Sequence, residues 1–179
     1  MDTNELNKIL LPNEKIIWQN TPRFLPFIVG QTFVSVIAGL FLLIFMSNLV
    51  FFLLSNDVPP FYTLLFSPLI LLTFFMLCFP ITYNLLVYGR TIYAISDQRV
   101  IIQSGVIGRD FYAAPLKTIS NVSVRVGLFD KLFLQNTGSI YISTAGTFIA
   151  TNRGAMPAAY VFFNIPNPYE VFNIINVNR

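Results

Sequence analysis

The side chains that most often do chemistry in proteins are scarce in this chain, and they are scattered. The chain contains no histidine, which excludes Ser-His-Asp and Cys-His catalysis and histidine-based metal sites. Its one cysteine, Cys78, lies within a long apolar segment. After residue 90 the acidic residues stand far apart, at Asp97, Asp110, Asp130 and Glu170. We therefore expect no catalytic residue, no metal site and no cofactor, and we expect that the protein is not an enzyme.

Two further kinds of chemistry are also poorly supported. Gly127 and Gly138 flank a predicted helical turn, but no Lys-Ser or Lys-Thr pair follows them as in a phosphate-binding loop. Nucleic-acid binding usually needs a basic stripe interleaved with aromatic residues, and the chain has none. We expect neither a nucleic-acid partner nor a small-molecule substrate.

With catalysis, metal binding and nucleic-acid binding poorly supported, we expect the protein to act by surface recognition. Four basic residues lie on or near loops and polar strand faces: Arg109, Lys117, Arg125 and Lys131. If they cluster toward a bilayer, each can gain about 1 kcal/mol from anionic headgroups. An ordinary solvated face is the favoured explanation, because residues 90–179 hold eight Lys or Arg against four Asp or Glu. We keep the four residues as candidate headgroup or partner contacts.

The elements that must position these residues begin with a long uncharged stretch. From Phe24 to Gly89 the only charged residue is Asp57, within the polar break 55–60. The break leaves segments 24–54 and 61–88, each longer than the roughly 20 apolar residues that cross about 30 Å of hydrocarbon. Two segments cannot close a barrel, so we expect two transmembrane helices. The alternative is a buried hairpin of a soluble protein, whose helices are usually shorter and have a polar face.

The orientation of this hairpin follows from the Lys and Arg residues near its ends. Lys8, Lys15 and Arg23 precede the first helix, Arg90 and Arg99 follow the second, and the turn has no basic residue. We therefore expect a multi-pass protein of the cell membrane with both termini cytoplasmic.

Within the helices, the small residues Thr32, Ser35 and Gly39 share one face of the first helix. Such a face can pack closely on the second helix or on another copy of the chain. Pro68 and Pro80 are expected to bend the second helix or to mark its ends.

After Arg90 the sequence changes to short β-rich runs. Residues 120–126 alternate, with three valines on one face and polar residues on the other, which predicts a half-buried strand. Ala145-Gly146 is expected to end the fifth strand. The predicted strands are seven: 91–96, 99–104, 110–114, 120–126, 139–143, 148–150 and 159–163, the last two on either side of the loop 152–157.

Two helical pieces accompany these strands. Residues 128–133 fit one or two helical turns, with Asp130 as an ordinary helical-turn residue. A final helix should begin after Asn167 as a cap, with Pro168 in its first turn and Glu170 three residues after the cap, and end near Asn178.

Several phrases, taken in order, resemble a known family. They are Leu11–Ile17, Tyr93–Ile101, Pro115–Ile119, Gly127–Phe129, Gly138–Gly146 and Asn164–Glu170. This order is similar to that in the bacterial pleckstrin-homology-like (PH-like) membrane proteins of the YdbS-like group. The resemblance implies a short cytoplasmic lead, a two-helix hairpin and a cytoplasmic PH-like domain. It brings no established catalytic residue.

The chain departs from this pattern at one loop. Residues 134–137 lengthen the connection before Gly138, so no binding role is carried over to it. The dense basic run of phosphoinositide-binding PH domains is also missing, because the hairpin 91–104 offers only Arg99.

These observations predict one architecture. We expect an α+β membrane protein with a lead at 1–23, a transmembrane hairpin at 24–89, and a PH-like β-sandwich or barrel of about seven strands with a C-terminal helix at 90–179. The leading hypothesis for function is a membrane-anchored, non-enzymatic module that binds other membrane proteins or itself. The alternatives are sensing of anionic lipid headgroups and service as an accessory subunit of a channel or transporter.

Overall fold

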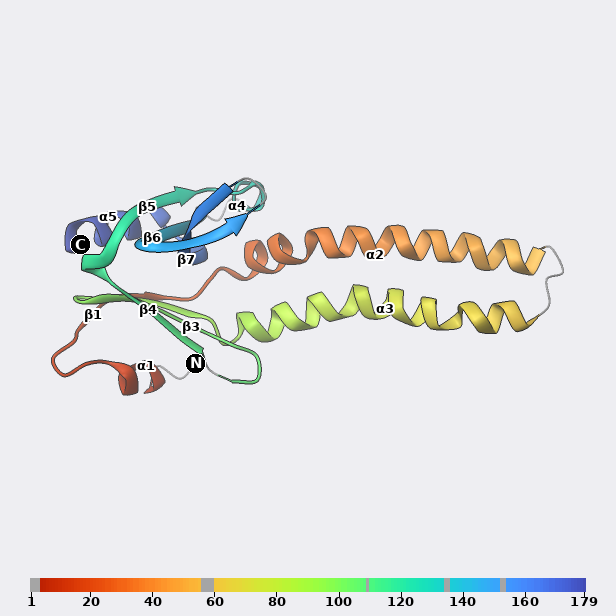
Figure 1. Ribbon diagram of the computed structural model, residues 1–179, viewed down its shortest axis with the longest axis horizontal. Coiled ribbons are helices and arrows are strands. Elements are labelled where there is room, and N and C mark those ends of the chain that lie inside the picture. Colours follow the sequence, from red (N-terminus) through yellow and green to blue (C-terminus); the bar gives the residue numbers. More distant parts are fainter. Residues whose placement is uncertain (1–3, 56–59, 109, 134–135, 152–153) are drawn as a thin grey trace. The chain divides into compact units, whose positions relative to one another are not determined.

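The computed structural model describes residues 4–55, 60–108, 110–133, 136–151 and 154–179. Figure 1 shows its helices and strands along the chain. They form two compact units, of which the first joins Met1–Phe27 to Val87–Arg179 and the second is Ile28–Leu86.

Two long helices account for the second unit. Helix α2 spans Phe24–Ser55 and helix α3 spans Pro60–Tyr88, within one residue of the predicted ends. Asp57 and the rest of the predicted turn at 56–59 lie outside the described residues. Both helices are long and apolar enough to cross a membrane. Large apolar side chains are exposed along them, including Phe41 (70%), Phe51 (72%) and Leu71 (71%).

The small residues of α2 lie on its packed side. Gly39 is buried, and a Cβ atom added to it would come within 2.6 Å of Leu77 Cγ on α3. Thr32 is buried as well, and its hydroxyl donates to the carbonyl of Ile28 at 2.7 Å. Ser35 is half-buried. Pro68 and Pro80 both lie inside α3, so they do not mark its ends.

The first unit is built from two antiparallel sheets. Sheet A has the order β1-β2-β3-β4, with bounds Ile16–Asn20, Ile92–Ser96, Arg99–Ser104 and Asp110–Pro115. Sheet B has the order β5-β6-β7, with bounds Ile119–Arg125, Thr137–Thr151 and Gly154–Pro166. The helical pieces are α1 (Asn4–Ile9), η1 (Leu116–Thr118), α4 (Leu128–Leu132) and α5 (Pro168–Asn178).

Strand β1 precedes the long helices and was not predicted. It pairs antiparallel with β2, placing Trp18 opposite Ile95 and Asn20 opposite Tyr93. The connection from β1 to β2 therefore contains both α2 and α3, and the sheet unit is discontinuous in sequence. It follows that 91–104, compared above with the first hairpin of a PH domain, forms the second and third strands of sheet A, β2 and β3, and not the first two.

The strand count reaches seven in a different way from the prediction. Ala145-Gly146 does not end a strand, because β6 continues to Thr151 and joins the predicted strands 139–143 and 148–150. The pairing with β7 shifts register between Ser143 and Phe148, and such a bulge lets a strand bend without ending. Within the described residues, six strands thus follow the long helices and one precedes them.

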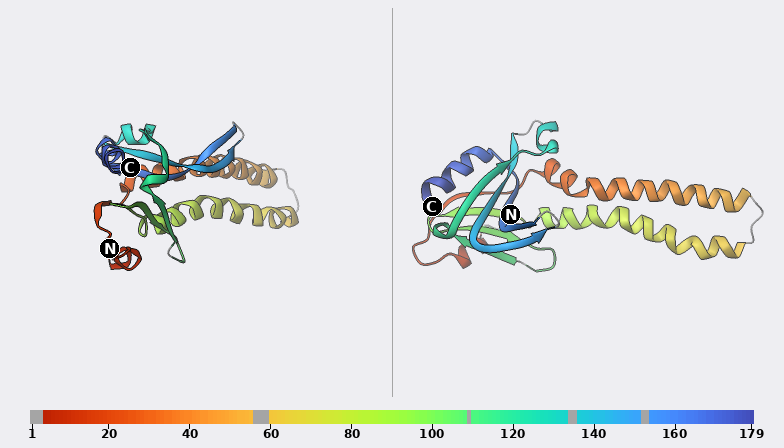
Figure 2. Two further views of the ribbon diagram at one scale, coloured as in Figure 1. Left: turned by 60° about the vertical axis from the view of Figure 1, so that its left-hand side comes forward. Right: turned by 45° about the horizontal axis from the view of Figure 1, so that its top comes forward.

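The main core lies between the sheets and under α5. Tyr93 of β2 stacks on Phe162 of β7, with ring centroids 4.7 Å apart. The Tyr93 hydroxyl accepts a hydrogen bond from the Phe163 N–H at 3.1 Å, and burial raises the pKa of this hydroxyl above its ordinary value. Helix α5 adds Val171 and Ile175 to the same core. Figure 2 shows α5 beside the two sheets.

A second cluster covers the other face of sheet A. Leu6 of α1 is fully buried against Ile92, Ala94 and Ile101. Strand β2 is consequently buried on both faces. The segment before the long helices thus supplies both an edge strand and a covering helix to the β unit.

Candidate functional site

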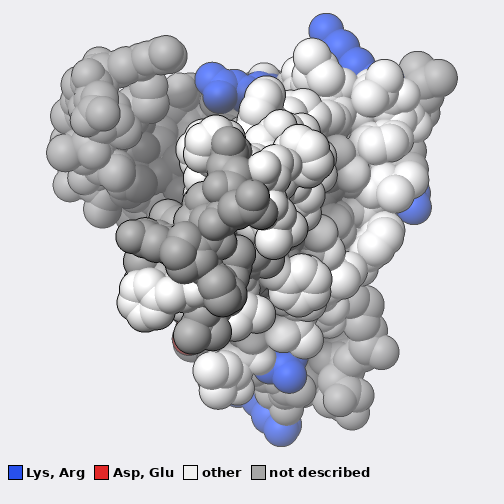
Figure 3. Space-filling model, turned by 90° about the vertical axis from the view of Figure 1, so that its right-hand side faces the viewer, with Lys and Arg blue, Asp and Glu red and all other residues white. Residues whose placement is uncertain are grey.

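The structure does not gather the four candidate basic residues. Lys117 lies in η1, before β5 begins, and Arg125 is the last residue of β5. A strand of that length separates its ends by about 20 Å. Lys131 lies on α4, and Arg109 lies outside the described residues. On the face drawn in Figure 3, the described Lys and Arg side chains lie at separate points.

Arg125 instead belongs to an aromatic group on sheet B. Its guanidinium carbon lies 5.3 Å from the centre of the Tyr141 ring, within the range of a cation–π contact. The Tyr141 ring meets Phe163 edge-on at 6.5 Å. Arg125 is exposed, so it remains accessible to solvent or to a partner.

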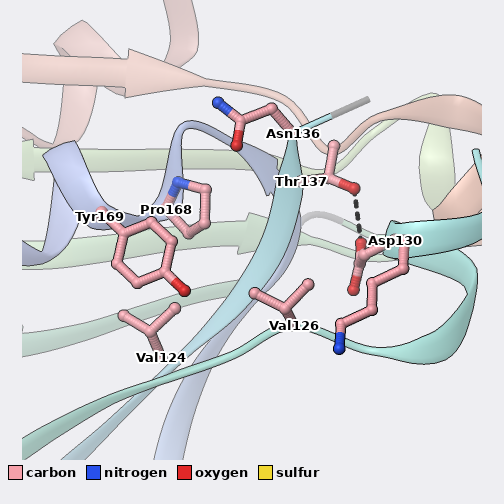
Figure 4. Close-up of a pocket in the computed structure, with 8 residues that line it drawn as sticks. Val124, Val126, Asp130, Asn136, Thr137, Pro168 and Tyr169 are labelled. Atoms are coloured by element: carbon pink, nitrogen blue, oxygen red, sulfur yellow. Dashed lines mark hydrogen bonds between the residues drawn. The ribbon is translucent and has the colours of Figure 1, made fainter. Parts of the chain in front are cut away.

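Lys131 lies at an open cavity of about 550 Å³. Strand β5 and the residue after it supply Val124 and Val126, and α5 supplies Pro168 and Tyr169. The other lining residues are Asp130, Asn136 and Thr137. Figure 4 shows Tyr169 and Pro168 on one side of this space, and Asp130 and Thr137 on the other. We call it the β5–α5 cavity.

Asp130 lines the cavity but is already hydrogen-bonded through both oxygens. Its Oδ1 accepts from the Thr137 hydroxyl at 2.6 Å and from Asn164 Nδ2 at 2.9 Å, and its Oδ2 accepts from the Gly127 N–H at 2.8 Å. The side chain is 4% exposed. Asp130 therefore connects α4 to β6 and to the end of β7 through hydrogen bonds. Its carboxylate is not free to act as a base. The sequence showed only that Asp130 sits three residues after Gly127, a spacing that suits a cap at the start of a helix.

The start of α5 differs from the predicted cap. Asn167 occupies the N-cap position, but with φ 49° and ψ 57° its side chain makes no capping bond. Its Oδ1 accepts from Asn136 Nδ2 at 2.8 Å, and its N–H donates to the Asn136 carbonyl at 3.0 Å. Asn136 also has a positive φ, 47°, which asparagine tolerates better than most residues. The two asparagines tie the loop before β6 to α5 at the margin of the cavity.

Because residue 138 is a glycine, α5 can pack closely against β6. A Cβ atom at this position would lie 2.9 Å from Pro168 Cγ and 3.2 Å from the Arg125 carbonyl oxygen. The second distance shows that the Arg125 carbonyl faces β6. Because backbone groups alternate in direction along a strand, those of Val122 and Val124 face away from β6. In the described residues β5 pairs only with β6, so this side is an open sheet edge, and Val124 lines the cavity beside it.

A second polar cluster joins the N-terminal segment to the β2–β3 turn. Glu14 Oε1 accepts from Arg99 Nε at 2.9 Å and from the Ser96 hydroxyl at 2.6 Å. Its Oε2 accepts from Arg99 Nη2 at 2.9 Å and from the Leu11 N–H at 2.7 Å. Arg99 Nη2 also donates to the Ile9 carbonyl at 2.6 Å.

Electrostatics at Glu14 favour its charged form. Burial of the carboxyl raises its pKa, but the hydrogen bonds from Arg99, Leu11 and Ser96, with the charge of Arg99, outweigh burial and lower the pKa below its ordinary value. This cluster joins the segment before β1 to the β2–β3 turn, and its residues do not line the β5–α5 cavity. Sequence reasoning missed it because Glu14 and Arg99 are 85 residues apart.

The chemistry of the β5–α5 cavity consists of a few polar groups on partly apolar walls. Among the described residues, no three His, Cys, Asp or Glu side chains could hold a metal ion together. The single carboxylate among the described cavity residues, that of Asp130, accepts hydrogen bonds through both of its oxygens, one of them from the Thr137 hydroxyl. The cavity combines apolar walls with the amide of Asn136, the phenol of Tyr169 and the ammonium group of Lys131. It lies beside the open edge of β5.

Antiparallel sheets of four and three strands, followed by a C-terminal helix that packs on the core, define the β unit as a PH-like domain. The chain belongs to the bacterial PH domain family, whose sequence model matches residues 24–179. The resemblance inferred from the sequence is thereby confirmed. Domains of this class are generally non-enzymatic. The matched range includes both long helices and begins after β1. No curated protein and no solved structure gives a significant match.

Proposed function

We propose that the protein is a membrane-anchored, non-enzymatic PH-like module that mediates protein interaction or self-assembly at the cytoplasmic face of the membrane. The observation that carries this proposal is the open edge of β5 beside a cavity whose walls include Val124, Val126 and Pro168. The proposal has two parts, the anchor and the binding surface, and each is supported separately.

The anchor is supported by the two long helices. At 1.5 Å per residue, the 32 residues of α2 and the 29 of α3 exceed the roughly 30 Å of a hydrocarbon core. A core helix of a soluble protein would bury its apolar residues, whereas only 6% and 11% of the two candidate spans are buried. Both spans connect to the β unit, through Phe27 and Val87, so that unit lies on one side of the membrane. Basic residues on both flanks favour the cytoplasmic side.

The binding surface is supported by the geometry of β5. An exposed sheet edge can accept an added strand, whose main chain provides affinity and whose alternate side chains enter pockets. Val122 and Val124 present their backbone groups to this edge, and the β5–α5 cavity lies beside them. We propose that an extended segment of a membrane protein, or of a second copy, binds here. Tethering in the same bilayer raises the effective concentration of such a partner, so the contact can be weak.

Photo-crosslinking in native membranes tests this surface. A photoreactive phenylalanine analogue replaces Tyr169 at the cavity, and a matched variant carries it at Tyr112 on β4. Both tyrosines are exposed. We expect discrete crosslinked products from position 169 and few from position 112. Equal products from both positions, or only uncrosslinked monomer from position 169, contradict the proposal.

Sensing of anionic headgroups is the second candidate, and the exposed cations Arg125 and Lys131 favour it. Its test uses the full chain in nanodiscs, because a fragment beginning at Arg90 lacks β1. If headgroups bind these side chains, hydrogen exchange in β5 and α4 should slow as anionic lipid is added, and Arg125→Ala with Lys131→Ala should abolish the slowing. If the hydrogen-exchange rates in β5 and α4 do not change with lipid charge or salt concentration, headgroup sensing is excluded.

A further inference from the structure

The connection between β3 and β4 presents an apolar tip to solvent. Ile107 is 99% exposed, the highest value among the described large hydrophobic residues. Val106 beside it is half-buried, and Gly105 and Gly108 flank the pair. An isoleucine is usually buried, and a side chain without contacts at the end of a hairpin adds nothing to the stability of its own fold.

The backbone conformation of this tip keeps Ile107 exposed. Gly105 has φ +134°, a conformation that side chains of L-residues rarely adopt. A Cβ atom at Gly105 would also lie only 2.4 Å from the Gly108 carbonyl oxygen. The chain therefore closes tightly across Gly105 and Gly108, which leaves the Ile107 side chain at the outermost point of the turn.

The tip lies beside the end of α3. A guanidinium N–H of Arg90 (Nη1) donates to the carbonyl oxygen of Val106. Arg90 follows α3 directly, and its own N–H donates to the Val87 carbonyl in the last turn of that helix at 3.1 Å. All of these residues belong to the β unit. Figures 1 and 2 show the β3–β4 connection reaching toward the end of the unit where this last turn lies.

The same end of the β unit carries other residues typical of a membrane interface. The rings of Phe24 and Tyr88, at the start of α2 and the end of α3, meet edge-on at 5.1 Å. Aromatic rings such as that of Tyr88 are enriched at headgroup depth, where arginine extends its charged end toward water and phosphate. Arg90 is exposed and links this region to the tip.

We propose that the β3–β4 tip inserts Ile107 into the interfacial layer of the bilayer, beside the point where α3 leaves it. The occupant of this apolar tip is lipid, because the tip is joined through Arg90 to the end of an apolar helix. This inference rests on the proposed membrane anchoring and extends it. The tip is a third membrane contact in addition to the two helices, and it fixes the orientation in which the β5–α5 cavity faces its partners.

The test uses the full chain in lipid nanodiscs with an environment-sensitive fluorophore on one cysteine. Ile107→Cys carries the probe in a Cys78→Ala background, and Val177→Cys is the matched apolar control, 82% exposed at the end of α5. Quenching is measured with iodide in the water and with a lipid that is spin-labelled near its headgroup. Because Ile107 has almost no contacts, its replacement should not disturb folding.

We expect the probe at position 107 to emit at shorter wavelength, to be quenched several-fold less by iodide than the probe at 177, and to be quenched by the spin-labelled lipid. Equal iodide quenching at both positions overturns the inference. Shielding from iodide without quenching by lipid also overturns it, because the tip then contacts protein.

A third probe separates this inference from the proposed function. In the wild-type chain the fluorophore is attached to Cys78, which is exposed on α3. If Cys78 is shielded from iodide while position 107 is not, the anchor stands and only the inference about the tip fails. If iodide also quenches at Cys78, the helices themselves are not in lipid, and the anchoring fails too.

Discussion

Single residues hold the two polar clusters of the β unit together, and Asp130 is the clearer case. Its carboxylate accepts three hydrogen bonds from residues of the α4 N-cap, β6 and β7. A buried group of this kind cannot be removed without leaving its former donors unpaired. The β5–α5 cavity depends on this arrangement, because Asp130 and Thr137 form part of its wall.

Asp130→Ala should therefore lower the free energy of unfolding by about 2–3 kcal/mol, since buried donors lose their acceptor. Thermal unfolding of the purified chain in detergent measures this loss. The neighbouring Lys131→Ala is the control, because Lys131 is exposed on the same short helix and its replacement should change stability little. Equal effects of the two substitutions would show that the hydrogen bonds of Asp130 contribute nothing.

Glu14 sets a dependence of stability on pH. Its pKa in the folded protein lies below the ordinary value, so the carboxylate stabilises the fold at neutral pH. This contribution is fully present above the pKa of the unfolded chain and is lost as the pH falls through the folded pKa. Glu14→Gln should cost about 2 kcal/mol at neutral pH, because Arg99 then loses its charged partner.

Unfolding at neutral and at acid pH checks this expectation. The wild type should lose more stability on acidification than the Glu14→Gln variant does, because the variant has no carboxylate to protonate at this position. Lys15→Ala serves as the control at an exposed neighbouring position. Parallel loss of stability in wild type and variant would contradict the role assigned to Glu14.

At the scale of elements, the sequence predicted best what depends on local pattern. Both long helices were found within one residue, because a charge-free run of that length has few alternatives. Strands β2 to β5 were found because β-branched residues and turn residues follow each other there. Strand β1 was missed, because its five residues alternate weakly and its partner β2 lies more than 70 residues away.

The candidate site likewise contains some residues that the sequence predicted and others that it did not. Lys131 was selected from its charge and does line the cavity, whereas Val124, Val126 and Tyr169 were not selected as site residues. Their role follows from the close approach of α5 at Gly138, which only the tertiary structure shows. Gly105 illustrates the same limit, since its φ of +134° and the lack of room for a Cβ atom beside the Gly108 carbonyl are seen only in the structure.

The part played by β1 leads to a prediction about truncation. A fragment beginning at Arg90 should fail to form the PH-like unit, because it leaves the edge of β2 unpaired and removes Trp18 from its place against Phe162, where the rings lie 6.0 Å apart. A fusion of residues 1–23 to 87–179 through a short flexible linker is the matched control. Hydrogen exchange in β2 measures the difference. Slow exchange in the fragment that begins at Arg90 would show that β1 is dispensable.

Packing between the two long helices gives a second prediction at this scale. Gly39→Leu should destabilise the hairpin, because even a Cβ atom would lie 2.6 Å from Leu77 Cγ. Ala38→Leu, at an exposed neighbouring position on α2, is the control. Thermal unfolding in detergent should show a lower midpoint for the variant at 39 alone. A similar midpoint for both variants would mean that the face containing Gly39 is not tightly packed.

At the scale of the whole molecule, the chain connects a PH-like domain to two apolar helices through a single connection of that domain, from β1 to β2. Since both helices occupy the connection from β1 to β2, two covalent links join them to the β unit.

The proposed membrane anchoring requires both chain termini on one side of the membrane and the turn between the helices on the other. In a Cys78→Ala background, Asp57→Cys should react with a membrane-impermeant maleimide in intact cells, whereas Val177→Cys should react only after permeabilisation. The expected asymmetry follows from the basic residues, which flank the helices and are absent from residues 55–60. Labelling of Val177→Cys in intact cells would place the β unit outside, where no cytoplasmic partner could reach its open strand edge. Labelling of neither position before permeabilisation, and of both after it, would remove the membrane-spanning hairpin itself.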